Sequence, residues 1–174
     1  MEVLKQLIEE YNSEYRSHLN SHLEFYKNLE SIEEVLKYAP SGEDYSPYKK
    51  HKHQWRVSVQ AIESTRQNLL NIKAQILRST KFDDILKQVK KASVIGFGKL
   101  ASYDTALRIG AFMNIFPEVV YLHCGTKDGA RNIGLGYNKE FIAKEELPEP
   151  LKVFEPYEVE AFFCVEKDKL RQIS

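Results

Sequence analysis

The sequence predicts a mostly helical protein, with a long antiparallel helical hairpin over residues 1–80 and a compact helical domain over residues 81–174. Three observations lead to this prediction. Apolar residues recur every three or four positions over most of the chain, which is the spacing of one helix face. Pro and Gly gather mainly between these periodic segments, and neither interrupts residues 4–37. Only two short segments, 119–122 and 151–154, have the composition of strands.

The first predicted helix covers residues 4–37. Its spacing alternates between four and three without a break, as in a coiled coil or a long helical hairpin. The predicted face consists of Leu4, Ile8, Tyr11, Tyr15, His18, His22, Phe25, Leu29, Ile32 and Leu36. Pro40 and Gly42 then end the helix, since Pro cannot continue one and Gly suits the turn beyond it.

A polar linker over residues 40–53 leads to a second predicted helix, residues 54–78. Trp55, Val59, Ile62, Leu69 and Ile76 form its apolar face, and we expect it to pair antiparallel with the first helix. Further helices are predicted at 82–91, 99–113 and 156–170. Ser79 and Thr80 are the expected cap of the first of these.

The composition limits the classes of function. The 174 residues are 43% hydrophobic, which excludes global disorder, and no stretch of 18 apolar residues suggests a membrane span. The N-terminal residues lack the pattern of a signal peptide, and the two cysteines suggest no disulfide framework, so we expect a cytoplasmic protein with reduced thiols.

The formal net charge of zero hides a strong segregation along the chain. Residues 1–44 carry 4 basic and 10 acidic side chains, residues 45–139 carry 16 and 6, and residues 140–174 carry 5 and 9. The middle block, with a net charge of +10, is therefore the candidate anion-binding region. The alternative is that the acidic ends fold back and neutralise it.

The most informative motif is a Gly-x-Gly turn between two predicted helices. Gly96 and Gly98 precede Lys99, and Ala101 is small enough for the two helices to pack closely. Glycines permit positive φ and a close approach to a ligand, and the free amides at the start of the second helix favour a phosphate. A turn whose glycines only permit tight packing remains the alternative.

Over residues 82–125 the chain resembles a helix-hairpin-helix DNA-binding motif, as found in the helix-hairpin-helix superfamily of DNA glycosylases. The resemblance implies that the amides of Gly96, Gly98 and Lys99 hold a DNA phosphate. It does not extend to the catalytic residues. Leu100 stands where bifunctional members carry a lysine, and Tyr121 stands where an aspartate is expected downstream. A catalytic carboxylate would have to come from elsewhere, with Asp104 and Asp128 as candidates, and we expect no base excision.

Two basic segments extend the predicted nucleic-acid site. Lys49, Lys50 and Lys52 form a cluster at the end of the linker, and Lys127 and Arg131 follow Gly125 in what reads as a second anion-binding turn. A capped turn leading into a short helix is the alternative for the latter. Asp104 and Arg108 are four residues apart, and we expect them to pair on one helix face.

The histidines and cysteines suggest no catalytic or metal site. His18 and His22 have a spacing that can hold zinc, but both fall on the apolar face. His51 and His53 lie in the basic linker, where contact with solvent or phosphate is the favoured interpretation. We expect Cys124 and Cys164 to be buried structural residues, and we predict no cofactor.

The expected function is therefore non-catalytic binding of DNA phosphates, largely independent of sequence, within a DNA-processing or defence assembly. The first rival is a diverged DNA glycosylase or lyase. The second is a helical interaction module that self-associates, or binds a protein partner, through residues 4–36. We expect no membrane partner.

Overall fold

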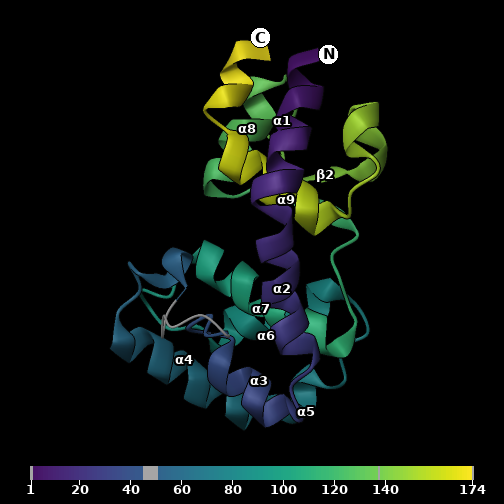
Figure 1. Ribbon diagram of the computed structural model, residues 1–174. Coiled ribbons are helices and arrows are strands. Elements are labelled where there is room, and N and C mark those ends of the chain that lie inside the picture. Colours follow the sequence, from purple (N-terminus) through teal and green to yellow (C-terminus); the bar gives the residue numbers. More distant parts are fainter. Residues whose placement is uncertain (1, 45–50, 137, 174) are drawn as a thin grey trace. The chain divides into compact units, whose positions relative to one another are not determined.

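The computed structural model describes residues 2–44, 51–136 and 138–173, and it is mostly helical (Figure 1). The α-helices are α1 (Glu2–Glu14), α2 (Arg16–Lys27), α3 (Ile32–Tyr38), α4 (Val59–Asn71), α5 (Lys73–Ile76), α6 (Phe82–Ala92), α7 (Lys99–Met113), α8 (Cys124–Asn132) and α9 (Pro156–Glu166). Short 3-10 helices are η1 (Lys52–Gln54), η2 (Lys144–Glu146), η3 (Glu149–Leu151) and η4 (Lys169–Ile173). Among the described residues, no helix has the length and apolar character needed to cross a membrane.

The chain divides into two compact units whose boundaries differ from the segments 1–80 and 81–174 suggested by the sequence. The first unit combines residues 1–20 with residues 117–174, and the second comprises residues 21–116. The first unit is thus assembled from the two ends of the chain.

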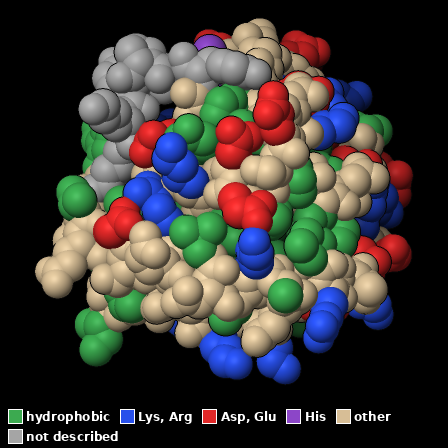
Figure 2. Space-filling model, turned by 90° about the horizontal axis from the view of Figure 1, so that it is seen from below, with side chains coloured by type: hydrophobic (Ala, Val, Ile, Leu, Met, Phe, Trp, Pro, Cys, Tyr) green, Lys and Arg blue, Asp and Glu red, His purple; other side chains and the backbone are tan. Residues whose placement is uncertain are grey.

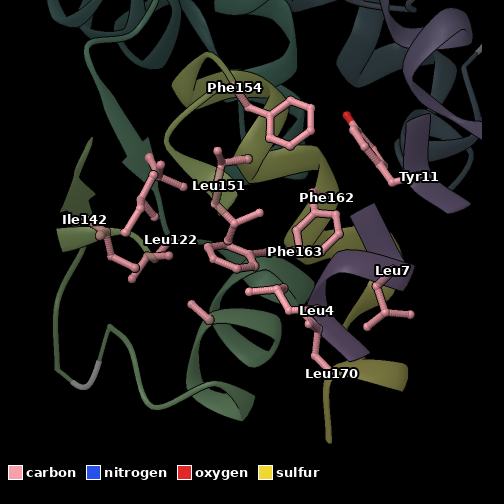
Figure 3. Packing of buried hydrophobic residues seen from close by; sticks show 14 residues of the cluster. Leu4, Leu7, Tyr11, Leu122, Ile142, Leu151, Phe154, Phe162, Phe163 and Leu170 are labelled. Atoms are coloured by element: carbon pink, nitrogen blue, oxygen red, sulfur yellow. The ribbon is translucent and has the colours of Figure 1, made fainter. Parts of the chain in front are cut away.

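The first unit is built around a two-stranded antiparallel sheet with α1, α8 and α9. Strand β1 (Val119–Tyr121) pairs with β2 (Phe141–Ala143) in a register that places Val120 opposite Ile142. Leu4, Leu7 and Tyr11 of α1 join the same core as Phe162 and Phe163 of α9 (Figure 3). The Tyr11 ring lies edge-on to Phe162, with ring centroids 5.6 Å apart.

The second unit is an assembly of helices around α7. Helix α6 has one buried apolar face, formed by Phe82, Ile85, Leu86 and Val89, and this amphipathic pattern explains why the segment is helical. Helix α7 packs against α6 and α3. Most of its side chains are buried, including the polar residues Ser102, Thr105 and Arg108.

The prediction of one unbroken helix over residues 4–37 is wrong. The helical segment stops after Lys27, and α3 begins again at Ile32. Ser31 caps the new helix by accepting a hydrogen bond from the Glu34 amide at 3.3 Å, and the Glu34 carboxylate accepts one from the Glu30 amide at 3.0 Å. These capping bonds stabilise a helix start inside the apolar repeat, because they satisfy amides that a helix end leaves unpaired.

The second predicted helix is also shorter than expected. Ser58 accepts a hydrogen bond from the Ala61 amide, so α4 begins at Val59 and not at residue 54. Trp55 and Val59, predicted to lie on the buried face, are exposed, whereas Ile62, Leu69 and Ile76 are buried as expected. The expected antiparallel pairing is reduced to contact between α3 and α4, and α1 packs against α9 and η4 instead.

The remaining elements agree more closely with the sequence. Helices α6 and α7 occupy the predicted segments, and β1 covers most of the predicted strand at 119–122. The second predicted strand, 151–154, is wrong, because Leu151 ends the 3-10 helix η3 and β1 pairs with β2. The last helix begins at Pro156 as predicted but ends at Glu166.

Candidate nucleic-acid interface and a neighbouring histidine–aspartate cluster

The predicted Gly-x-Gly turn forms an exposed hairpin between α6 and α7. Gly96 has φ of +91° and Gly98 has φ of +67°, so both glycines occupy conformations that other residues rarely adopt. The Phe97 amide closes the turn on the Val94 carbonyl at 3.0 Å, and the Phe97 ring is buried against α4 and α7 residues. The Ile95 side chain is fully exposed.

The hairpin leads directly into an uncapped helix start. Gly98 is the residue before α7 and has no side chain to cap it. A Cβ built on Gly98 would meet no atom within 4 Å. Glycine is therefore favoured at this position by the positive φ of the backbone and not by crowding. The first amides of a helix without a side-chain cap are suited to bind an anion, because they point along the helix axis and carry partial positive charge.

The residues that flank this hairpin in the sequence carry positive charges only. Between Asp84 and Asp104 the sequence carries four basic side chains and no carboxylate; these are Lys87, Lys90, Lys91 and Lys99. All four lysines are exposed, as is Lys52 of η1. Lys49 and Lys50, which belong to the same predicted site, lie outside the described residues.

Part of the basic middle block is neutralised by the acidic N-terminal block, as the alternative interpretation of the charge pattern foresaw. Glu33 pairs with Lys73, and Glu43 lies 3.9 Å from Arg66. On the face drawn in Figure 2, acidic side chains lie among the basic ones and do not leave a field of single charge. The charge excess near the hairpin is therefore a local feature.

Lys127 and Arg131 belong to the first unit, whereas Gly96, Gly98 and Lys99 belong to the second. Lys127 and Arg131 lie on α8, with Gly125 in its first turn and Gly129 within the helix. A Cβ on Gly129 would stand 2.2 Å from the Phe163 carbonyl oxygen of α9. These glycines permit α8 and α9 to pack closely, and anion binding by Lys127 and Arg131 stays a prediction.

A cluster of polar side chains in the second unit was not predicted. Its centre is the Arg108 guanidinium, which is 2% exposed. Arg108 donates hydrogen bonds to His22 Nε2 at 2.9 Å, the Ala39 carbonyl oxygen at 2.8 Å and Gln54 Oε1 at 3.4 Å. Gln54 Nε2 in turn donates to Asp104 Oδ2 at 3.3 Å. Asp104 and Arg108, expected to pair directly, are thus linked through Gln54.

Three histidines surround this centre. His53 Nδ1 lies 3.0 Å from Asp104 Oδ2, and His51 Nδ1 accepts a 3.3 Å hydrogen bond from the His53 amide. The ring centroids of His51 lie 4.8 Å from those of His53 and 5.1 Å from those of His22. Gly42, with φ of +71°, packs directly against the cluster. Its lack of a side chain is required there, because a Cβ would stand 2.6 Å from the His51 Cβ.

The hydrogen bonds fix the protonation of His22. Arg108 can only donate, so His22 Nε2 must be the acceptor, and Nδ1, which lies 2.5 Å from Asp44 Oδ2, carries the proton and donates a hydrogen bond to that carboxylate. Burial, followed by the Arg108 charge, lowers the pKa of His22 to about 4 against the opposing effect of Asp44. Burial likewise lowers the pKa of His51 to about 3, with the Arg108 charge as the next cause.

Asp104 remains ionised in this setting. Burial by itself raises the pKa of Asp104, but the hydrogen bond from His53 and the charge of Arg108 together outweigh burial, and the pKa is lowered. The cluster therefore holds two carboxylates, Asp44 and Asp104, against one guanidinium and neutral His22 and His51 rings.

The positions discussed for glycosylase chemistry are divided between the two units. Leu100 is on the first turn of α7, whereas Tyr121 ends β1 in the other unit. Asp104 is held by His53 and Gln54, and Asp128 is exposed on α8.

The remaining histidines and cysteines differ from expectation in part. His18 is exposed on α2, and Cys124 is exposed at the start of α8, so the prediction that Cys124 is buried is wrong. Cys164 is partly buried. His123 Nδ1 lies 3.3 Å from Glu160 Oε1, which also accepts a hydrogen bond from Thr126 at 2.6 Å. The sequence carried no signal for that contact.

No protein-family model, no curated protein and no solved structure matches the chain. The site therefore has to be interpreted from its own geometry.

Proposed function

We propose that the chain binds the phosphate backbone of duplex DNA, without sequence preference, through the hairpin at residues 94–99. One observation carries the proposal. Two exposed glycines with positive φ stand immediately before the uncapped start of a 15-residue helix. Exposed lysines on both sides of that turn supply the charge that a phosphate backbone requires.

The mode of contact follows from the geometry of the hairpin. A phosphate oxygen would accept hydrogen bonds from the amides that open α7, and the Lys99 ammonium would add a longer-range attraction. The exposed Ile95 at the tip would contact sugar and base edges in the groove. Contacts of this kind set position on the duplex but do not read its sequence.

The test is fluorescence anisotropy with a labelled duplex at 50 and 200 mM salt. Neutralising about four phosphates predicts a slope near −3.6 in log K against log salt, hence a loss of affinity of about 100-fold between these two concentrations. Lys99→Ala should weaken binding to every sequence and reduce the slope by about 0.9. Lys5→Ala, at an exposed lysine of α1 that belongs to the other unit and not to the predicted site, makes the same charge change and should have little effect.

A second pair of variants tests the backbone. Gly98→Val and Gly134→Val both place a β-branched residue at a positive φ, and at both positions a Cβ meets no atom within 4 Å. The conformational strain, about 1–2 kcal/mol, is therefore matched. Loss of binding in a folded Gly98→Val but not in Gly134→Val supports the hairpin as the site. Equal loss in both, or no salt-sensitive binding by the wild type at 50 mM salt, rejects the proposal.

A further inference from the structure

The fold brings together three side chains that the sequence separates by up to 53 positions. His51 caps the 3-10 helix η1 and His53 lies within it, whereas Asp104 is on the second turn of α7. One potential ligand atom from each of these residues lies within 4.8 Å of the other two. A tetrahedral ion bound at about 2.1 Å holds its ligands about 3.4 Å apart, so binding would require the ligand atoms to approach one another by at most about 1.4 Å.

Arg108 leaves the three proposed ligands free to face a cation. Among the described residues, its hydrogen bonds go to His22, Ala39 and Gln54, and not to His51, His53 or Asp104. The Asp104 carboxylate can therefore contribute its negative charge to a bound divalent ion.

The surroundings hold the three side chains in place. Gln54, itself bonded to Arg108, donates to the Asp104 carboxylate, and the His53 amide donates to the His51 ring. Metal ligands are usually oriented by such hydrogen bonds from neighbouring groups. The site is also accessible, because the side chains of His53 and Asp104 are 33% and 12% exposed.

We propose that His51, His53 and Asp104 bind one divalent transition-metal ion of the zinc class, with water at the remaining coordination position. Two imidazole nitrogens and one carboxylate oxygen suit Zn²⁺, Co²⁺ or Ni²⁺, whereas Ca²⁺ and Mg²⁺ prefer sites built of oxygen. The ion would replace the contact between His53 Nδ1 and Asp104. Three protein ligands with an open position are the arrangement of zinc ions that interact with a further molecule.

The test is calorimetric titration of tag-free protein, stripped with a chelator, with Zn²⁺ alone. We expect one ion per chain. His53→Ala and Asp104→Asn should weaken binding by more than about 100-fold, since replacing even a residue that supports a ligand costs about 10–100-fold. His18→Ala, an exposed histidine outside the cluster, is the matched control and should bind as the wild type does.

Trp55 provides a second readout. It is the single tryptophan of the chain and lies two residues after His53. Ni²⁺, which quenches indole fluorescence at short range, should quench Trp55 saturably in the wild type and in His18→Ala but not in His53→Ala. Circular dichroism confirms that each variant is folded.

The results decide between a site and chance proximity. Undiminished Zn²⁺ affinity in a folded His53→Ala, equal loss in His18→Ala, or no binding by the wild type at micromolar Zn²⁺ would overturn the proposal. If Asp104→Asn does not fold, the fluorescence and calorimetry of His53→Ala decide the question alone.

Discussion

Replacing Arg108 by Met should destabilise the second unit severely. The side chain of Met has a comparable length and fills much of the same volume, but it cannot donate hydrogen bonds. Arg108 is 2% exposed and donates to the Ala39 carbonyl, His22 and Gln54. Its removal leaves these acceptors without their donor and takes away a positive charge that lowers the pKa of Asp104.

The magnitude follows from what remains buried. Removing one partner of a buried charged network costs about 3–5 kcal/mol, because the other charge stays desolvated without compensation. For a chain of this size each kcal/mol lowers the melting temperature by about 2–4 °C, so the expected shift is about 6–20 °C. Arg108→Lys keeps the charge, but its ammonium cannot reach all three acceptors. The stability of this variant should therefore lie between that of Arg108→Met and that of the wild type.

The assay is urea unfolding and differential scanning calorimetry in the presence of a chelator. Arg78→Met is the control, since Arg78 is exposed and lies in the same unit. If Arg108→Met costs less than about 1 kcal/mol, or no more than Arg78→Met, then Arg108 does not hold the cluster together. The hydrogen bonds described for it would then carry no net stability.

Two further predictions concern packing and pH. Gly129→Ala should cost more than the about 1–3 kcal/mol typical of overpacking, because its Cβ would stand 2.2 Å from the rigid Phe163 carbonyl oxygen. Gly125→Ala, whose nearest neighbours at 3.2 and 3.3 Å are flexible side chains, should cost much less when both are compared by urea unfolding. The pKa of His22, about 4 when folded, lies below its unfolded value of about 6.5, so its contribution to stability is present above pH 6.5 and is lost as the pH falls toward 4. Through this group alone, the free energy of unfolding should therefore be about 2 kcal/mol lower at pH 5.0 than at pH 7.5. A stability that does not change over that range would contradict the buried neutral ring.

Local patterns predicted the bounds of α6 and α7 well, because apolar spacing and the flanking turn residues agree there, although α6 begins after Lys81 without the cap expected from Ser79 and Thr80. The apolar residues of α6 recur at helical spacing, and Gly98, with its positive φ, marks the position just before α7 begins. The long first helix failed for the opposite reason. Its apolar repeat continues through Leu29, but the capping signal formed by Ser31 and Glu34 lies inside that repeat. A local hydrogen-bond signal thus prevailed over periodicity, and it was present in the sequence.

The glycines near basic residues have two different structural roles that the sequence does not distinguish. Gly96 and Gly98 adopt positive φ in an exposed turn, whereas Gly125 and Gly129 lie within a helix and make room for α9. Both pairs stand near basic residues, so composition alone could not separate the two roles. The difference depends on which neighbour each glycine meets, and that neighbour is distant in the sequence.

The histidine–aspartate cluster could not have been found from local patterns at all. The sequence places His51 and His53 in a basic linker and predicts that Asp104 pairs with Arg108. The cluster depends instead on the packing of η1 against α7, which places Asp104 beside a histidine 51 residues away. A linker of ordinary composition thereby contributes two of the three proposed metal ligands.

The two proposals depend on different features of α7, so each can be tested and rejected independently of the other. Phosphate binding depends on the exposed amides and on Lys99 at the start of the helix, whereas metal binding depends on Asp104, five residues further along, and on side chains from η1. Arg108 supports only the second, through Gln54. Helix α7 is buried over most of its length, and the two proposals assign its first turn to the phosphate contact and its second turn to the cation site. A failure of DNA binding would leave the evidence for the cation site unchanged, because no contact used for one proposal is used for the other.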